Sequence, residues 1–127
     1  MSNILTTTIV NDSPVVAFPA GANLTGLEGQ LVKLSSGTAV ASSVVGEQVL
    51  GVLVAGNIQG NTVGVQVYAR SKVIAKTALA VGAYVSSNGD GTVKAAVTGD
   101  WIVGQILETA AIGQRVDFVI LHAGYAK

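Results

Sequence analysis

The sequence contains no cysteine, and aromatic and charged residues are scarce, at 5% and 11% of 127 residues. Without cysteine the chain can form no disulfide framework, no thiolate metal site and no thiol nucleophile. Seven basic residues balance seven acidic ones, so the chain lacks the net positive charge that draws proteins to nucleic acid. We therefore expect no direct nucleic-acid partner.

Long apolar runs are also missing. Nowhere are there the roughly 18 uninterrupted apolar residues that span a bilayer. The first 13 residues, MSNILTTTIVNDS, lack the charged start and the continuous apolar run of a signal peptide. We therefore expect no membrane partner, and a soluble protein that is made in the cytoplasm.

Hydrophobic residues, in contrast, make up half of the chain. One domain of this length can bury most of its apolar surface. With so few charges, however, an isolated monomer would have difficulty covering the rest with solvated groups. This composition favours an assembly that hides apolar area.

The chain contains an internal repeat, in which residues 46–68 return as residues 99–121 without a gap. The shift of 53 residues relates Gly46 to Gly99, Gly51 to Gly104, Gly60 to Gly113 and Val63 to Val116 (99−46, 104−51, 113−60, 116−63). Such a repeat predicts two similar structural units. The whole repeats run from about residue 24 to 68 and from about 77 to 121.

The local patterns predict strands. Val63, Val65 and Val67 alternate with more polar residues, and period two is typical of a half-buried strand. Residues 35–38 and 88–92 have the glycine, serine and asparagine of hairpin turns. We predict an all-β fold of eight or nine short strands, as two similar four-strand units. Because closure removes unpaired edges, we expect one compact barrel or a clipped β-sandwich of the β-tulip or β-clip kind over residues 21–127.

Residues 1–20 lie outside this repeat and carry both prolines, Pro14 and Pro19. Proline removes a backbone donor and favours extended structure before it. We interpret the segment as an extended arm that is able to add a strand to a neighbour's sheet; the alternative is a frayed terminus. Its strand-forming residues are Ile4, Leu5, Thr6, Thr7, Thr8, Ile9 and Val10.

The residues that could carry chemistry are isolated from one another. His122 is the single histidine, and the carboxylates are scattered along the chain, so we predict no catalytic site, no metal site and no cofactor. Glu47 and Asp100 follow equivalent repeat glycines (100−47 = 53), which favours a role in loop geometry.

Four residues are candidates for an interface. Arg70, Lys72 and Lys76 fall on one face if their segment is extended, and they form either a solvated strand face or a patch for an acidic partner. Trp101 replaces Gln48 in the repeat. Large aromatic residues anchor many interfaces, although core packing is an equal alternative for this one.

The chain resembles the small decoration or cement proteins of tailed-bacteriophage capsids in three features. These are the arm, the G-x-L-V-x-L segment at residues 29–34, and the G-x-x-V-x-V-x-V segment at residues 60–67, which recurs in modified form at 113–120. This resemblance implies a β-rich homotrimer on the outside of the expanded head, and localisation to the virion. It also implies that the arm, Pro14 included, extends a sheet of the major capsid protein.

The leading hypothesis is therefore a structural protein that stabilises a phage head. The alternative is a carbohydrate-binding or cell-surface-binding β module, for which the sequence offers few aromatic residues. An enzyme that depends on His122 is a third and less favoured hypothesis.

Overall fold

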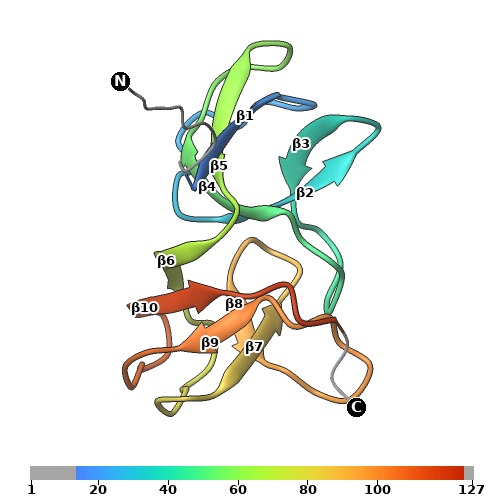
Figure 1. Ribbon diagram of the computed structural model, residues 1–127. Coiled ribbons are helices and arrows are strands. Elements are labelled where there is room, and N and C mark those ends of the chain that lie inside the picture. The colour runs from blue at the N-terminus through green and yellow to red at the C-terminus, as the bar shows by residue number, and fades with distance from the viewer. Residues whose placement is uncertain (1–13, 125–127) are drawn as a thin grey trace, which may run out of the picture.

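The computed structural model describes residues 14–124, and it consists of strands and loops (Figure 1). No helix occurs within these residues, so none is present that could cross a membrane. The strands form two antiparallel five-stranded sheets. The prediction of an all-β fold is confirmed.

Each sheet is built from one half of the chain. The first has the order β1-β5-β4-β2-β3, with the strands β1 (Val15–Pro19), β2 (Leu31–Ser35), β3 (Thr38–Ala41), β4 (Gly51–Ala55) and β5 (Thr62–Gln66). The second has the order β6-β10-β9-β7-β8, with the strands β6 (Ala69–Ile74), β7 (Tyr84–Ser87), β8 (Val93–Ala95), β9 (Gly104–Ile106) and β10 (Arg115–Ile120). We refer to them as unit 1 and unit 2.

The repeated unit has five strands, so the prediction of four was wrong. The additional strand of unit 1 is β1, which was assigned to the arm. It pairs with β5 as β6 pairs with β10, and Val15 opposite Gln66 corresponds to Arg70 opposite Val119. The β5 and β10 positions differ by 53 (119−66), whereas the β1 and β6 positions differ by 55 (70−15). Unit 1 thus has two extra residues between its first two strands, which hid β1 from a comparison at one constant shift.

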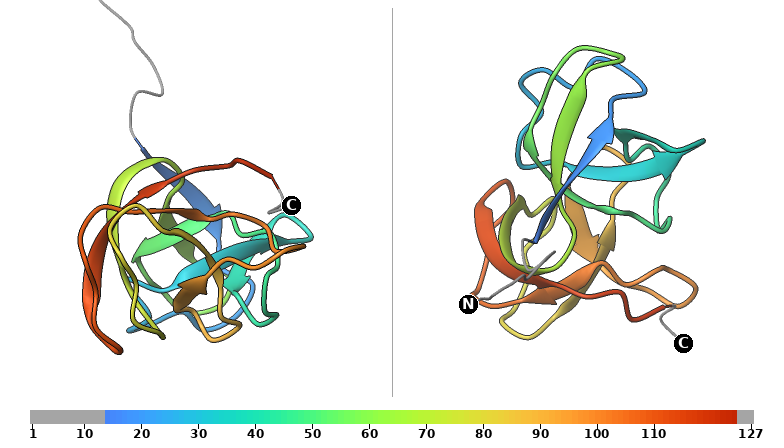
Figure 2. Two further views of the ribbon diagram at one scale, coloured as in Figure 1. Left: turned by 90° about the horizontal axis from the view of Figure 1, so that it is seen from below. Right: turned by 45° about the horizontal axis from the view of Figure 1, so that its top comes forward.

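Of the two architectures expected, a compact barrel or a β-sandwich, the two sheets are consistent with the β-sandwich and do not join into a closed barrel. Each one instead curls on itself (Figure 2). In unit 1 a parallel bridge between Ala20 and Ala39 connects the ends of β1 and β3, the two outer strands of the sheet. Ala75 and Val93 form the equivalent bridge in unit 2. These bridges close one end of each sheet, and the result is a pair of curled sheets with a waist between them (Figure 1).

The core crosses that waist. Ala20, Leu24, Val32, Ala39, Leu53, Val63 and Val65 form the buried cluster of unit 1. The larger cluster of unit 2 is centred on Phe118, and it includes Leu31, Val49 and Val52 from unit 1. Because these three side chains pack with the core of the other half, the two units share buried apolar surface, whose removal from water stabilises their contact.

The chain passes from one unit to the other through a tight corner at Tyr68 and Ala69. Ala69 has a left-handed φ of 74°, a conformation that costs an alanine about 1 kcal/mol or more. The side-chain amide of Gln66 donates hydrogen bonds to the carbonyls of Tyr68 (3.0 Å) and Arg70 (2.7 Å) and so holds the corner. The predicted turn at 35–38 is confirmed as a two-residue hairpin, with positive φ at Ser36 and Gly37.

Candidate functional site

The predicted capsid-binding arm lies mostly outside the described residues, because Ile4, Leu5, Thr6, Thr7, Thr8, Ile9 and Val10 precede residue 14. Pro14 is described, and it belongs to the folded unit. Its carbonyl accepts a hydrogen bond from the Val67 amide at 2.8 Å, directly beyond the β1–β5 ladder. The boundary predicted at residue 20 is therefore too late, since the sheet already begins at residues 14 and 15.

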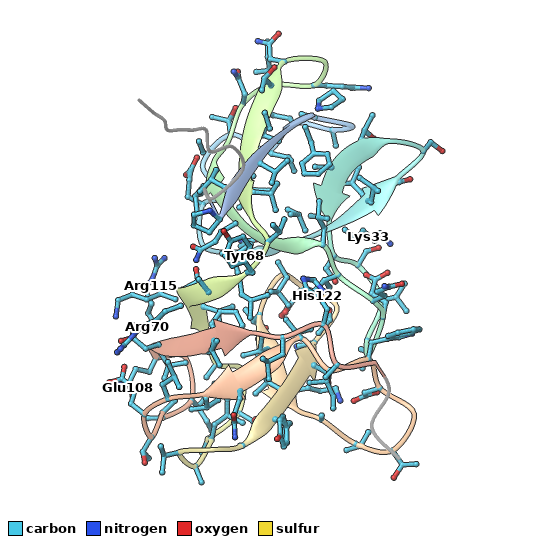
Figure 3. All side chains as sticks on the ribbon, in the orientation of Figure 1. Lys33, Tyr68, Arg70, Glu108, Arg115 and His122 are labelled. Carbon is cyan, nitrogen blue, oxygen red and sulfur yellow. The ribbon has the colours of Figure 1, made fainter. Side chains whose placement is uncertain are left out.

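Two predicted interface residues, Arg70 and Lys72, are exposed on β6; Figure 3 labels Arg70. Both bind the carboxylate of Asp117 on the neighbouring strand β10, each at 2.5 Å. The hydrogen bonds from Lys72 and Arg70 hold the pKa of Asp117 below its ordinary value. The two cations thus form a strand-face ion cluster within unit 2.

Lys76 lies beyond the end of β6 and pairs with Asp90 in the 88–92 turn, at 3.6 Å. That turn has the predicted hairpin chemistry, because the Asp90 carboxylate accepts hydrogen bonds from the amide and the hydroxyl of Thr92. Arg70 and Lys72 therefore share one partner, whereas Lys76 pairs with a different carboxylate in another loop.

Sequence reasoning missed Arg115, the first residue of β10. Within residues 14–124 its guanidinium makes no hydrogen bond and no ion pair, unlike the cations around it (Figure 3). It lines a cleft of about 200 Å³ between the units, together with Glu28, Val54 and Lys72. The signal in the sequence was a charged residue where the first copy of the repeat has Thr62 (115−62 = 53).

Glu47 organises the loop between β3 and β4, as its repeat position predicted. Its carboxylate accepts hydrogen bonds from the amides of Ser43 (2.8 Å) and Val44 (2.9 Å) and from the Ser42 hydroxyl (2.8 Å). Lys33 completes the cluster with an ion pair of 3.0 Å. Burial alone would raise the pKa of Glu47, but these donors outweigh it and lower that pKa.

Asp100 has the equivalent role in unit 2. It accepts hydrogen bonds from the Val97 amide (3.0 Å) and the Ser86 hydroxyl (2.8 Å), and it pairs with Lys94 at 2.5 Å. Burial again opposes ionisation, and the donors again hold the pKa of Asp100 below its ordinary value. Both carboxylates are therefore structural parts of loops, as predicted.

The remaining predicted interface residue, Trp101, is half-buried beside His122. Both line a small hollow, and His122 also lines the adjoining groove of about 300 Å³ with Leu34, Gln48 and Leu50. The His122 Nε2 lies 2.8 Å from the Val67 carbonyl. Because a carbonyl only accepts hydrogen bonds, Nε2 must carry the proton. His122 thus ties the end of the second sheet to the junction between the units.

No constellation for catalysis or metal binding is visible in the part of the chain that the structure describes. There, no group of three or more His, Asp or Glu side chains could hold a metal ion. His122 has a backbone partner, and the best-buried carboxylates bind loop amides and lysines. What this surface offers is a charged strand face, an unpaired arginine in a cleft and exposed apolar residues.

Comparisons with known proteins support the fold. No protein-family model matches the chain, and no curated protein matches its sequence. Among solved structures, the chain is similar to the crystal structure of the head fiber gp8.5 N base in bacteriophage phi29. The TM-score is 0.66 at 24% identity, and the match covers 89% of this chain and 98% of that one. This chain therefore shares the all-β fold of a bacteriophage head protein.

Proposed function

We propose that this protein is a structural component of a bacteriophage particle and binds the outer surface of the capsid. One observation carries the proposal, namely the similarity in fold to a phage head fiber base over nearly the whole of that chain. The sequence resemblance to capsid decoration proteins leads independently to the same class of protein.

The properties of the chain are consistent with this role. A protein anchored on a particle does not depend on net charge to remain dispersed, and this chain has a formal net charge of zero with 50% hydrophobic residues. Thirteen large hydrophobic side chains are exposed in the described structure. Such side chains indicate a binding site where they form a contiguous patch.

We further propose that the N-terminal arm makes the primary attachment by adding a strand to the major capsid protein. The deletion that tests this must end before residue 14, because Pro14 and β1 belong to the sheet of unit 1. Removal of residues 2–13 should abolish binding to purified expanded heads that lack the protein. The matched control replaces residues 2–13 by a Gly/Ser segment of equal length, which keeps the chain length and removes the strand-forming side chains.

Both variants should unfold in urea at the same midpoint as the full chain, because the described sheet is intact in them. Binding by either variant as tight as that of the full chain would refute the attachment through the arm. A strand added to the capsid protein should also protect arm amides from hydrogen exchange on the particle.

The proposal extends to a homotrimer that stabilises the head. Its expected signs are a mass of three chains per bound unit on the particle and a higher temperature of head disruption when the protein is present. Heads that disrupt at the same temperature with and without saturating protein would leave attachment in place and refute stabilisation.

One observation favours the second candidate, a carbohydrate-binding or cell-surface-binding module. The groove beside His122 has room for a sugar ring and is lined by Gln48, and Trp101 lines the small hollow that adjoins it. Aromatic faces and amide side chains are common in such sites. A glycan array probed with the full chain and with Trp101→Ala distinguishes the candidates, because a structural head protein should bind no glycan in a Trp101-dependent manner.

A further inference from the structure

The two units carry very different outer faces at equivalent positions. In unit 2, Lys72 on β6 lies opposite Asp117 on β10, and the two form an ion pair. The equivalent pair in unit 1 is Ala17 on β1 opposite Gly64 on β5. Val15 likewise occupies the place of Arg70. Where unit 2 has a charged strand face, unit 1 thus has a face without charge.

This uncharged face continues across β4. A Cβ atom placed on Gly64 would lie 3.2 Å from Val15 and 3.5 Å from Val54, so the two valines flank the glycine. They are 41% and 40% exposed, respectively. We call this surface the β1–β5–β4 face and define it as Val15, Ala17, Val54, Ala55 and Gly64. A solvated strand face normally carries charged residues, as unit 2 shows. Here the only polar residues of β5 on the outer side are the uncharged Thr62 and Gln66, and an exposed apolar surface without charge is typical of one that another molecule covers.

The β1–β5–β4 face adjoins the cleft that contains Arg115, because Val54 belongs to both. The Arg115 guanidinium packs over Gly29, where an added Cβ would lie 2.9 Å from a terminal nitrogen. An arginine held in this way, with no carboxylate partner among the described residues, presents a fork that fits an incoming carboxylate. The surface therefore combines an apolar area with one unpaired positive charge at its border.

The acidic residues within 14–124 make that part of a second copy a poor partner for this surface. Every described carboxylate is already ion-paired or hydrogen-bonded within its own chain, as seen for Glu28, Glu47, Asp90, Asp100, Glu108 and Asp117. A carboxylate for Arg115 would thus come more readily from a different protein. The position of the arm supports the same conclusion, because residues 1–13 join the fold at Pro14, directly beside β1.

We infer that the β1–β5–β4 face and Arg115 form the surface that lies against the capsid, and that the capsid there presents apolar side chains bordered by an Asp or Glu that pairs with Arg115. This inference rests on the proposed function and assigns the part of the folded domain that makes contact once the arm is attached.

Unit 2 supplies the design of the test. The double substitution Ala17→Lys and Gly64→Asp places the Lys72–Asp117 ion pair of unit 2 on unit 1, where the sheet has the same register. The matched control is Val44→Lys with Val97→Asp, which adds the same two charges at exposed valines of the β3–β4 and β8–β9 loops, outside the β1–β5–β4 face. For the cation, Arg115→Glu is compared with Lys76→Glu, another exposed cation.

Binding of each full-length variant to expanded heads that lack the protein is measured by co-sedimentation, with urea unfolding as the check of folding. We expect Ala17→Lys/Gly64→Asp to weaken binding at least about tenfold, because docking against apolar side chains would remove the new ion pair from water. We expect Arg115→Glu to weaken binding by at least the same factor, because it brings two like charges into contact. Both control variants should bind within about twofold of the original chain.

The outcomes separate this inference from the proposed function. If the original chain binds no heads, the proposed function fails, and this inference fails with it. If the original chain binds and the two face variants bind equally well, only this inference is refuted. Loss of binding in the Val44/Val97 control alone also refutes it, by placing the contact at those loops. A face variant that changes the oligomeric mass in solution and leaves head binding unchanged would assign the face to contacts between copies and overturn the inference.

Discussion

Asp100 offers the sharpest test of how the repeated loops stabilise the fold. Its carboxylate forms an ion pair with Lys94 and accepts two further hydrogen bonds, and the side chain of Lys94 is 16% exposed. Substitution of Asp100 by Ala leaves the ammonium of Lys94, the hydroxyl of Ser86 and the amide of Val97 without this partner. The same substitution therefore removes one favourable charge and leaves three hydrogen-bond donors without their acceptor.

The expected loss of unfolding free energy is about 3 kcal/mol, the lower end of the range for breaking a buried ion pair by removing one partner. The lower end applies because both side chains keep some contact with water, at 16% and 12% exposure. With a urea m-value of roughly 1.5 kcal/mol/M, this loss moves the midpoint of unfolding by about 2 M. The variant Asp100→Ala/Lys94→Met should recover part of the loss, because no unpaired charge remains.

The measurement is equilibrium urea unfolding followed by far-ultraviolet circular dichroism. Lys76→Ala is the control, since it breaks an exposed pair of 3.6 Å and should cost less than about 1 kcal/mol. The reasoning is refuted if Asp100→Ala costs no more than this control. It is also refuted if the double variant is no more stable than Asp100→Ala.

Three further predictions concern stability. Gly51→Ala should destabilise the fold by about 3 kcal/mol or more through overpacking, because the new Cβ would lie 2.0 Å from the Gln66 carbonyl oxygen. The control in thermal unfolding is Gly64→Ala, where the nearest neighbour is a valine methyl at 3.2 Å. This control should change the melting temperature little. Ala69→Gly should raise the free energy of unfolding by up to about 1 kcal/mol, and with it the melting temperature, since Ala69 has a φ of 74°. An unchanged or lower melting temperature would argue against a strained corner. The pKa values of Glu47 and Asp100 are lowered from ordinary values of 4.5 and 3.8. Their contribution to the free energy of unfolding is therefore complete above those values and is lost as the pH falls through the folded-state pKa values. Urea midpoints should decrease below about pH 4, and Glu47→Gln/Asp100→Asn should show a smaller decrease over that range.

Much of the fold could be predicted from local pattern. The repeat at a shift of 53, the valine alternation around Val63 and the turns at 35–38 and 88–92 all correspond to observed features. Glycine indicates a positive φ and alternating valine indicates a half-buried strand, and both are local properties that depend little on distant residues. The repeated loop carboxylates were identifiable for the same reason, since Glu47 and Asp100 bind amides only three or four residues away.

The errors lie where a residue's role depends on distant neighbours. The strand β1 was assigned to the arm because VVAFP and RSKVI, the equivalent segments at 15–19 and 70–74, share almost no residues. Their outer faces differ because one carries charges and the other does not, and the two extra residues after β1 displaced it from the constant shift. The sequence left a barrel and a β-sandwich as alternatives, because the choice depends on how strand edges are closed by bridges such as Ala20 to Ala39, whose partners no local pattern indicates.

The sequence by itself determined the all-β class, the duplication, the turns and the lack of cysteine chemistry, because these follow from composition and from contacts between near neighbours. Only the tertiary structure decided that five strands form each sheet, that Arg70 and Lys72 share Asp117, and that Arg115 has no partner within residues 14–124. Strand pairing joins residues that lie tens of positions apart, and a charge is paired or unpaired only with respect to what the folded chain brings beside it. The face that we assign to the capsid contact is visible for that reason in the structure alone.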